Sequence, residues 1–247
     1  MSKLKKILQV LPSFNPSWGG PKKMVENFVE YIEKEKFADV DIVVTDIVGP
    51  SSKVNNSRVN IYELKVTALS KIWKTYSNDF KIFLNKNITN YDLIHIHEMW
   101  HYLHYYSAKL ATKNKIPYII TPHGGLEKRR LQDYKKKLFL NLVEKKILQN
   151  AKYIHALTKY EESDIIYTCP NANTVIVPNG VPEALPPKDK NKVLSNYKID
   201  QNSKKILFLG RLHPEKGVDI LLKSFKKKQF NNGEWTLILA LYQCKFS

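Results

Sequence analysis

Two cations in the C-terminal part of the sequence are spaced to bind a diphosphate. Arg211 and Lys216 are five residues apart in the segment Gly210–Gly217, which separates an apolar run from a helical pattern. The arginine guanidinium is a fork that matches phosphate oxygens, and the lysine ammonium is a compact point charge. We predict that both bind one diphosphate; the alternative is a pair of solvated loop cations.

A histidine followed by two glycines stands at the end of a short apolar run. His123, Gly124 and Gly125 follow the strand pattern Tyr118–Thr121. An imidazole there can donate a hydrogen bond or stabilise charge, and open parallel sheets bind ligands at the carboxyl ends of their strands. We predict that His123 and Gly124 contact a ligand; the alternative is a histidine that caps the next helix.

A pair of glycines follows the first apolar run of the chain. Gly19 and Gly20 precede Pro21, which suits the first turn of a helix. Glycines let backbone N–H groups approach an anion, and a helix N-terminus adds partial positive charge. We expect Gly19 and Gly20 to face a ligand, although an ordinary tight loop would have the same sequence.

One motif matches the zinc-protease pattern H-E-x-x-H through His97, Glu98 and His101. That chemistry requires both histidines on one face of a helix, with the glutamate as base. Here His97 ends the strand pattern Asp92–His97, so we expect the pair to span a strand-to-helix junction. A zinc hydrolase is therefore the less favoured reading. We expect no metal site. We expect the residues of this segment, His97 among them, to face the cleft at the strand end as substrate contacts.

Apolar runs that alternate with helical patterns must position these residues. Several runs are continuous, which is typical of parallel strands buried on both faces. The expected strands are Lys5–Ser13, Asp41–Val48, Val59–Leu64, Asp92–His97, Tyr118–Thr121, Tyr153–Leu157 and Val175–Val177. Helical patterns lie near 21–35, 68–86, 101–114, 131–149 and 159–167. This alternation predicts a doubly wound α/β domain with right-handed crossovers.

The organisation of the sequence changes after residue 180. Residues 1–180 are expected to form one complete Rossmann-like domain. Residues 181–203 contain several prolines and no strong period, which indicates a linker. Residues 204–247 open like a second α/β domain, but this piece is too short to bury a core alone. Its expected elements are the strands Lys204–Leu209 and Trp235–Leu241 and the helix Gly217–Lys228.

The composition indicates a packed protein with anionic partners. The 247 residues are 43% hydrophobic and include 40 Lys and Arg against 23 Asp and Glu, a net charge of +17. Such a charge favours phosphorylated small molecules, nucleic acid or acidic membranes. The basic residues show no recognition-module signature, so we expect no nucleic-acid partner. The two cysteines exclude a disulfide framework and a cysteine-built zinc site.

The clearest amphipathic pattern lies within 131–149, where apolar residues recur at helical spacing and lysines fill the other face. In the favoured reading this stripe packs on the sheet and leaves the lysines in water. In the alternative it lies on an acidic membrane surface, which would place the protein peripherally at the inner face of the membrane. No run approaches the roughly 18 apolar residues of a membrane span, and no signal-peptide cleavage site follows the first run. We expect a cytoplasmic protein.

Taken in order, these motifs resemble those of the retaining glycosyltransferase family 4, whose members have the two-domain GT-B architecture. The matching segments are Gly19-Gly20, Thr121-Pro122-His123-Gly124, Val177-Pro178-Asn179-Gly180-Val181 and Gly210-Arg211-Leu212-His213-Pro214-Glu215-Lys216-Gly217-Val218-Asp219. The resemblance implies an α/β fold of GT-B type. Here that would be one complete Rossmann-like domain (1–180), a linker (181–203) and the first β-α-β of a nucleotide-sugar-binding domain (204–247).

The resemblance also implies an activity and a role for each residue. The family moves a sugar from a nucleotide-diphosphate sugar to an acceptor with retention of configuration, and it typically needs no metal or other cofactor. His123 would hydrogen-bond the donor sugar, while Arg211 and Lys216 would neutralise the departing diphosphate. The residues expected to contact substrate are Gly19, Gly20, His97, Gly124, Asn179 and Gly180. The expected acceptor is a glycan or a lipid-linked intermediate in surface polysaccharide synthesis.

The sequence departs from the family pattern after the strand Trp235–Leu241. The family continues there with a glycine-bearing loop and an acidic motif that holds the donor, whereas this chain has Tyr242–Ser247. A normal domain would need on the order of another 100 residues. We therefore expect a C-terminally truncated transferase that is weak or inactive alone. The alternative is a non-catalytic module that binds acceptor or membrane.

Overall fold

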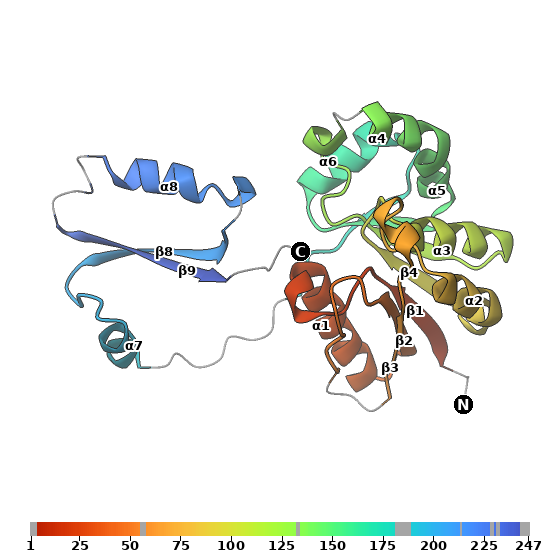
Figure 1. The fold of residues 1–247 in the computed structure, drawn as a ribbon, viewed down its shortest axis with the longest axis horizontal. Coiled ribbons are helices and arrows are strands. Elements are labelled where there is room, and N and C mark those ends of the chain that lie inside the picture. The colour runs from red at the N-terminus through yellow and green to blue at the C-terminus, as the bar shows by residue number, and fades with distance from the viewer. Residues whose placement is uncertain are drawn as a thin grey trace. The chain divides into compact units, whose positions relative to one another are not determined.

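The chain forms two compact units, Met1–Pro182 and Glu183–Ser247 (Figure 1). A computed structural model describes residues 4–54, 58–131, 134–180, 189–212, 214–227, 230 and 233–242. Of the expected linker 181–203, residues 181–188 lie outside the described part of the chain, as do His213 and residues 243–247.

A parallel sheet of seven strands forms the centre of the first unit, in the order β3-β2-β1-β4-β5-β6-β7. The strands are β1 (Lys5–Val10), β2 (Ala38–Thr45), β3 (Asn60–Leu64), β4 (Leu93–His97), β5 (Tyr118–Thr121), β6 (Tyr153–Ala156) and β7 (Thr174–Ile176). The chain proceeds outward from β1 to β2 and β3, and then returns to β4 on the other side of β1. The expected parallel α/β sheet is thus confirmed. The strand order reverses between β1 and β4.

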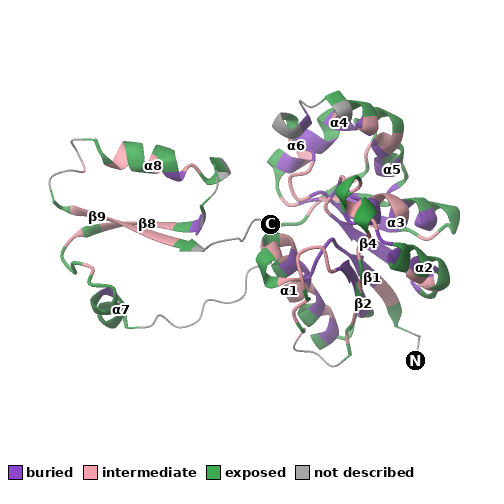
Figure 2. Ribbon diagram, viewed as in Figure 1, coloured by how far each residue is buried: buried purple, intermediate pink, exposed green. Residues whose placement is uncertain are grey.

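Helices cover both faces of this sheet, and each face has its own apolar core. On one face α1 (Gly20–Lys34) packs Val25 and Val29 against β2. The opposite face buries the apolar sides of α2 (Asn78–Asn87), α3 (Tyr102–Lys113), α5 (Lys145–Asn150) and α6 (Lys159–Thr168). Figure 2 shows the buried residues gathered along the strands and on the inner sides of these helices. This two-sided arrangement is the doubly wound architecture that the sequence predicts.

The helical pattern near 68–86 is broken into two parts. The short 3₁₀ helix η2 (Ala68–Lys71) is followed by Thr75, whose φ is 64°, and α2 begins only at Asn78. Ser77 caps α2 by accepting a hydrogen bond from the backbone N–H of Phe80 at 3.0 Å. A left-handed residue and a serine cap end one helix and start another, which apolar spacing alone does not reveal.

The pattern within 131–149 is also interrupted. Beyond the 3₁₀ helix η4 (Lys128–Leu131), the chain forms α4 (Tyr134–Phe139), a π-helical turn η5 (Leu140–Glu144), and then α5. Ile147 is buried, but Leu138 and Leu142 are exposed, so the expectation that the whole stripe packs on the sheet is wrong. The extra residue of the π turn shifts the apolar spacing.

The second unit contains a small parallel pair of strands. Its elements are α7 (Lys190–Asn196), β8 (Lys204–Arg211), the 3₁₀ helix η6 (Pro214–Lys216), α8 (Val218–Phe225) and β9 (Trp235–Tyr242). Helix α7 lies inside the expected linker and was not predicted; Asp189 caps it by accepting from the N–H groups of Asn191 and Lys192. Among the described apolar residues of this unit, only Leu194 and Val218 are buried.

Candidate functional site

The candidate site lies where β1, β4 and β5 end, at the point where the strand order reverses. Loops after two neighbouring strands run in opposite directions at such a point and leave a crevice, which is where open α/β sheets bind ligands. Most of the residues expected to contact a ligand in this unit follow these strands: Gly19 and Gly20 after β1, His97 at the end of β4, and His123 and Gly124 after β5. Asn179 and Gly180 instead follow β7.

His97 and His123 form a pair of imidazoles at this edge. Nε2 of His97 lies 2.7 Å from Oε1 of Gln9 on β1, and Nδ1 of His97 lies 3.2 Å from Nε2 of His123. A neutral His97 that donates from Nε2 to Gln9 has an acceptor at Nδ1, so His123 donates from Nε2. Nδ1 of His123 is then the remaining acceptor of the pair.

Burial keeps these histidines neutral at physiological pH. The pKa of His123 is lowered to about 4, first by desolvation and then by the nearby His155. The pKa of His97 is also well below its usual value, for the same leading reason. A neutral pair can accept and donate hydrogen bonds to an uncharged sugar but contributes no fixed positive charge.

A buried carboxylate holds the loop that carries His123. Oε1 of Glu161 on α6 accepts from the backbone N–H of Gly124 at 2.7 Å, and Oε2 accepts from that of Leu157 at 2.8 Å. The loop needs this support because His123 and Gly124 both have positive φ, 51° and 75°. Sequence reasoning missed Glu161; its only signal was the spacing from Thr158, a helix-cap pattern.

The β4–α3 turn supplies two further groups from the segment that the sequence predicts to face the cleft. Glu98 and Trp100 both have left-handed backbones, with φ of 64° and 68°. The indole N–H of Trp18 donates to the carboxylate of Glu98, and that of Trp100 donates to the carbonyl of Gly125 at 2.8 Å. The turn thus joins the loops after β1 and β5. Strained backbones of this kind cluster at functional sites.

The glycines after β1 sit in open surroundings. Gly19 has φ 82° and immediately precedes α1, whose first residue is Gly20. A Cβ at either position would meet no atom within 4 Å among the described residues. Space beside the backbone at a helix N-terminus is what an approaching anionic or polar ligand requires.

The H-E-x-x-H segment does not have the geometry of a zinc-protease helix. His97 is the last residue of β4 and His101 is the N-cap of α3, which confirms the expected strand-to-helix junction. Nδ1 of His101 accepts from the N–H of His104 at 3.1 Å, and its Nε2 faces the carbonyl of His97 at 3.2 Å. In the described part of the chain, no three His, Cys, Asp or Glu side chains are placed to share a metal ion.

A family comparison identifies the architecture that carries this site. The family model described as Glycosyltransferase Family 4 matches residues 18–185, which include Gly19, His97, His123 and Asn179. The chain belongs to glycosyltransferase family 4. No curated protein matches the sequence.

Solved structures show the same fold as this family 4 chain. It is similar to a sucrose-phosphate synthase from Thermosynechococcus elongatus, with a TM-score of 0.68, 16% identity and 95% of this chain covered. For a glycosyltransferase from Rickettsia africae the TM-score is 0.63, with 16% identity and 97% of this chain covered. For the E. coli trehalose-6-phosphate structure bound with UDP-2-fluoro glucose the TM-score is 0.62, with 13% identity and 98% of this chain covered. The matches cover 62%, 69% and 66% of those chains, respectively.

A row of hydrogen-bonded side chains crosses strands β4, β5 and β6 beside the histidine pair of the family 4 unit. Nε2 of His155 lies 2.7 Å from the carbonyl oxygen of Val177, and its Nδ1 lies 2.9 Å from the hydroxyl of Thr121. That hydroxyl lies 2.8 Å from Nε2 of His95 and accepts from it. The pKa of His95 is lowered to about 3, chiefly by burial.

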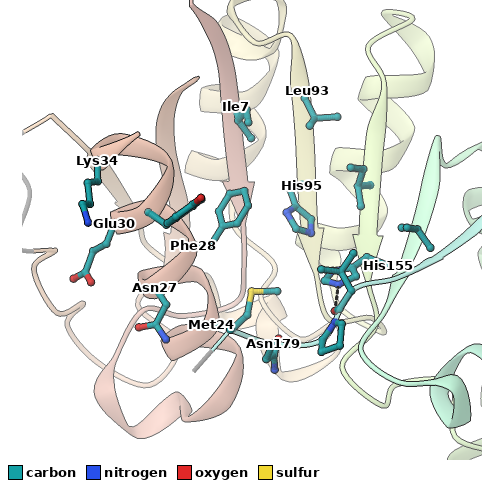
Figure 3. A pocket seen from close by; sticks show the side chains of 16 residues that line it. Ile7, Met24, Asn27, Phe28, Glu30, Lys34, Leu93, His95, His155 and Asn179 are labelled. Atoms are coloured by element: carbon teal, nitrogen blue, oxygen red, sulfur yellow. Dashed lines mark hydrogen bonds between the residues drawn. The ribbon is translucent and has the colours of Figure 1, made fainter. Parts of the chain in front are cut away.

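Two members of this hydrogen-bonded row, His95 and His155, line a groove of about 740 Å³ on the α1 side of the sheet. Figure 3 shows Phe28 and Met24 of α1 on one wall, with His95 and His155 across from them. Asn179 and Gly180 line the same groove, whereas His97 and His123 do not. The groove adjoins the histidine pair, because the rings of His95 and His97 have their centroids 4.1 Å apart.

The expected diphosphate-binding residues flank one turn of the second unit. Arg211 is the last residue of β8, and Lys216 is the exposed last residue of η6. Gly217 follows in the left-handed conformation, with φ 65°, and leads into α8. A turn of this form between a parallel strand and a helix can bring two cations toward one anion.

Proposed function

We propose that the family 4 protein represented by this chain transfers a sugar from a nucleotide-diphosphate sugar to an acceptor hydroxyl with retention of configuration. The supporting observation is the neutral His97–His123 pair at the strand-order reversal of a family 4 domain. An uncharged imidazole with a remaining acceptor at Nδ1 suits a sugar hydroxyl, which can donate a hydrogen bond to it.

In the proposed reaction, two cations of the protein balance the negative charge of the leaving diphosphate. The bond between the anomeric carbon and the diphosphate oxygen breaks, and Arg211 and Lys216 stabilise the negative charge of the departing group. The acceptor oxygen bonds to the anomeric carbon on the face that the diphosphate leaves, and the acceptor proton passes to the diphosphate. Because these two cations offset the charge, we propose that no metal is required.

The proposed substrates follow from charge and from a structural neighbour. The E. coli trehalose-6-phosphate structure holds UDP-2-fluoro glucose, which favours a nucleotide sugar as donor here. The net charge of +17 favours an acceptor of glycan or lipid-linked type near an acidic surface. We also propose peripheral contact with an acidic membrane at its cytoplasmic face. None of the described helices has the length and apolar character needed to cross a bilayer.

The test is incubation of the native gene product with a panel of nucleotide sugars and with glycan and polyprenyl-diphosphate acceptors. Proton NMR of the product reads the anomeric configuration. The proposal predicts transfer from at least one donor, with the configuration of the donor retained. An inverted product, or no transfer from any donor to any acceptor, would contradict it.

A further inference from the structure

The first unit exposes apolar side chains on two segments that are distant in the sequence. Ile72, directly after η2, is 86% exposed, and Leu69 of η2 is also exposed. On α4 and η5, Tyr134, Leu138 and Leu142 are exposed at intervals of four residues, with Leu142 at 71%. Large apolar groups grouped in this way on a protein surface mark an interaction site.

The two segments are joined by aromatic contacts. Trp73, next to Ile72, lies edge-on to Phe139, next to Leu138, with ring centroids 6.2 Å apart. Phe139 also lies 6.5 Å from Trp100, whose indole donates to the loop after β5. The exposed apolar groups therefore flank one aromatic cluster, and that cluster borders the candidate site.

The charge around this cluster is positive. Residues 65–75 include Lys65, Lys71 and Lys74 and no acidic residue. Residues 134–146 include five lysines and one acidic residue, Glu144, which is fully buried against His104. The ammonium groups of Lys74 and Lys136 lie over the rings of Trp18 and Trp100, at 4.9 and 6.0 Å from the centroids.

We propose that this apolar–basic surface, formed by Leu69, Ile72, Tyr134, Leu138, Leu142 and the lysines beside them, docks onto a bilayer that contains anionic lipids. Apolar side chains enter the boundary between headgroups and acyl chains, and lysines pair with anionic headgroups. The proposal rests on the proposed function in one respect: a docked bilayer would present a lipid-linked acceptor beside the loop of His123.

The bilayer fits this surface better than other partners do. A nucleic acid would use the lysines but not Ile72 or Leu142, because a phosphate backbone offers no apolar phase. An apolar partner protein would bury the aliphatic groups but would leave the flanking lysines without counter-charges. A surface of acidic lipids satisfies both kinds of side chain at once.

The experiment is co-sedimentation of the whole chain with vesicles of phosphatidylcholine alone and with vesicles containing 30 mol% phosphatidylglycerol. We expect binding to the anionic vesicles only, and weaker binding as the salt concentration rises. Ile72→Glu removes an apolar anchor and adds a repelling charge, so it should weaken partitioning by about tenfold or more. Ile82→Glu is the matched control, because Ile82 is an exposed isoleucine of α2 outside this surface.

The proposal is overturned if the chain does not bind anionic vesicles, or if Ile72→Glu and Ile82→Glu bind them equally well. Competition by soluble inorganic phosphate at equal anion concentration would also overturn it, since the ligand would then be a phosphate and not a bilayer. Vesicle binding needs no sugar transfer. A chain that binds vesicles but transfers no sugar would refute the proposed function and leave the docking surface in place.

Discussion

At the scale of single residues, hydrogen-bond geometry makes a site out of side chains that the sequence offers separately. The expectation that His97 and His123 face a ligand came from their positions at strand ends. Their contact with each other, and that of His97 with Gln9, depend on register between β1, β4 and β5. Glu161 escaped prediction because its partners are backbone groups, one of them 37 residues away.

The buried histidines predict that the protein loses stability on mild acidification. In the folded state the pKa of His95 is about 3 and that of His123 about 4, below the unfolded value near 6.5. Between the folded and the unfolded pKa values, the unfolded chain binds more protons than the folded protein does. The free energy of unfolding therefore falls as the pH drops below about 6.5. Each such histidine contributes up to about 1.4 kcal/mol per pH unit.

Urea unfolding at pH 7, 6 and 5 measures this dependence. His95→Gln keeps a donor toward Thr121 and removes one titrating group, so its stability should fall less steeply between pH 6 and 5 than that of the wild type. A wild-type stability that is constant from pH 6.5 to 5, or an unchanged slope in the variant, would show that these histidines do not remain neutral in the folded protein.

The Glu161 carboxylate predicts a local effect on the histidine loop. Glu161→Gln places an amide N–H₂ against one of two backbone N–H donors, so one buried hydrogen bond is lost at a cost of about 1–3 kcal/mol. Glu162→Gln is the control, because the neighbouring Glu162 accepts a hydrogen bond from the hydroxyl of Thr174 on β7 and not from the histidine loop. Equal changes in unfolding free energy for both variants would argue against the assigned role of Glu161.

At the scale of elements, apolar runs predicted where strands lie better than where helices break. The strand at Tyr118–Thr121 matches its expected limits, because a continuous apolar run of four residues between turn residues is too short for a helix. The pattern at 68–86 failed at Thr75, where a left-handed backbone has no signal in residue type. In 131–149 the π turn, with buried Glu144 at its end, moved Leu142 to the surface.

The start of α1 offers a prediction about an element boundary. Gly19 has φ 82° and ψ −131°, a conformation that only glycine adopts without strain, so Gly19→Ala should cost about 2 kcal/mol of unfolding free energy. Gly20→Ala is the matched control, since Gly20 is helical and its Cβ would enter open space. Thermal or urea unfolding compares the two. A Gly20→Ala variant that is as unstable as Gly19→Ala would contradict the assigned backbone geometry.

At the scale of the whole molecule, the two units differ in how much apolar surface they bury. The first unit has separate apolar cores on the two faces of its sheet. In the described part of the second, Leu207 and Leu209 on β8 are exposed and only Leu194 and Val218 are buried apolar residues. The sequence indicated this imbalance, because residues 204–247 are too few to build a core.

This imbalance predicts how fragments behave. Residues 1–182 alone should unfold cooperatively at the same urea midpoint as the whole chain, since their cores lie within the unit. Residues 183–247 alone should show no cooperative transition by circular dichroism. A large drop in the midpoint of the 1–182 fragment would mean that the first unit depends on the second for its stability.

We propose that the His97–His123 pair belongs to a sugar-transfer site. The most direct measurement is the rate of nucleoside diphosphate release from nucleotide sugars by the native gene product and its His123→Ala variant. Lys113→Ala, an exposed change at the end of α3, is the control, and circular dichroism verifies that each variant is folded. We predict that His123→Ala lowers the rate by about 100-fold or more while Lys113→Ala leaves it unchanged. A folded His123→Ala variant that releases the diphosphate as fast as the wild type would show that His123 has no part in sugar transfer.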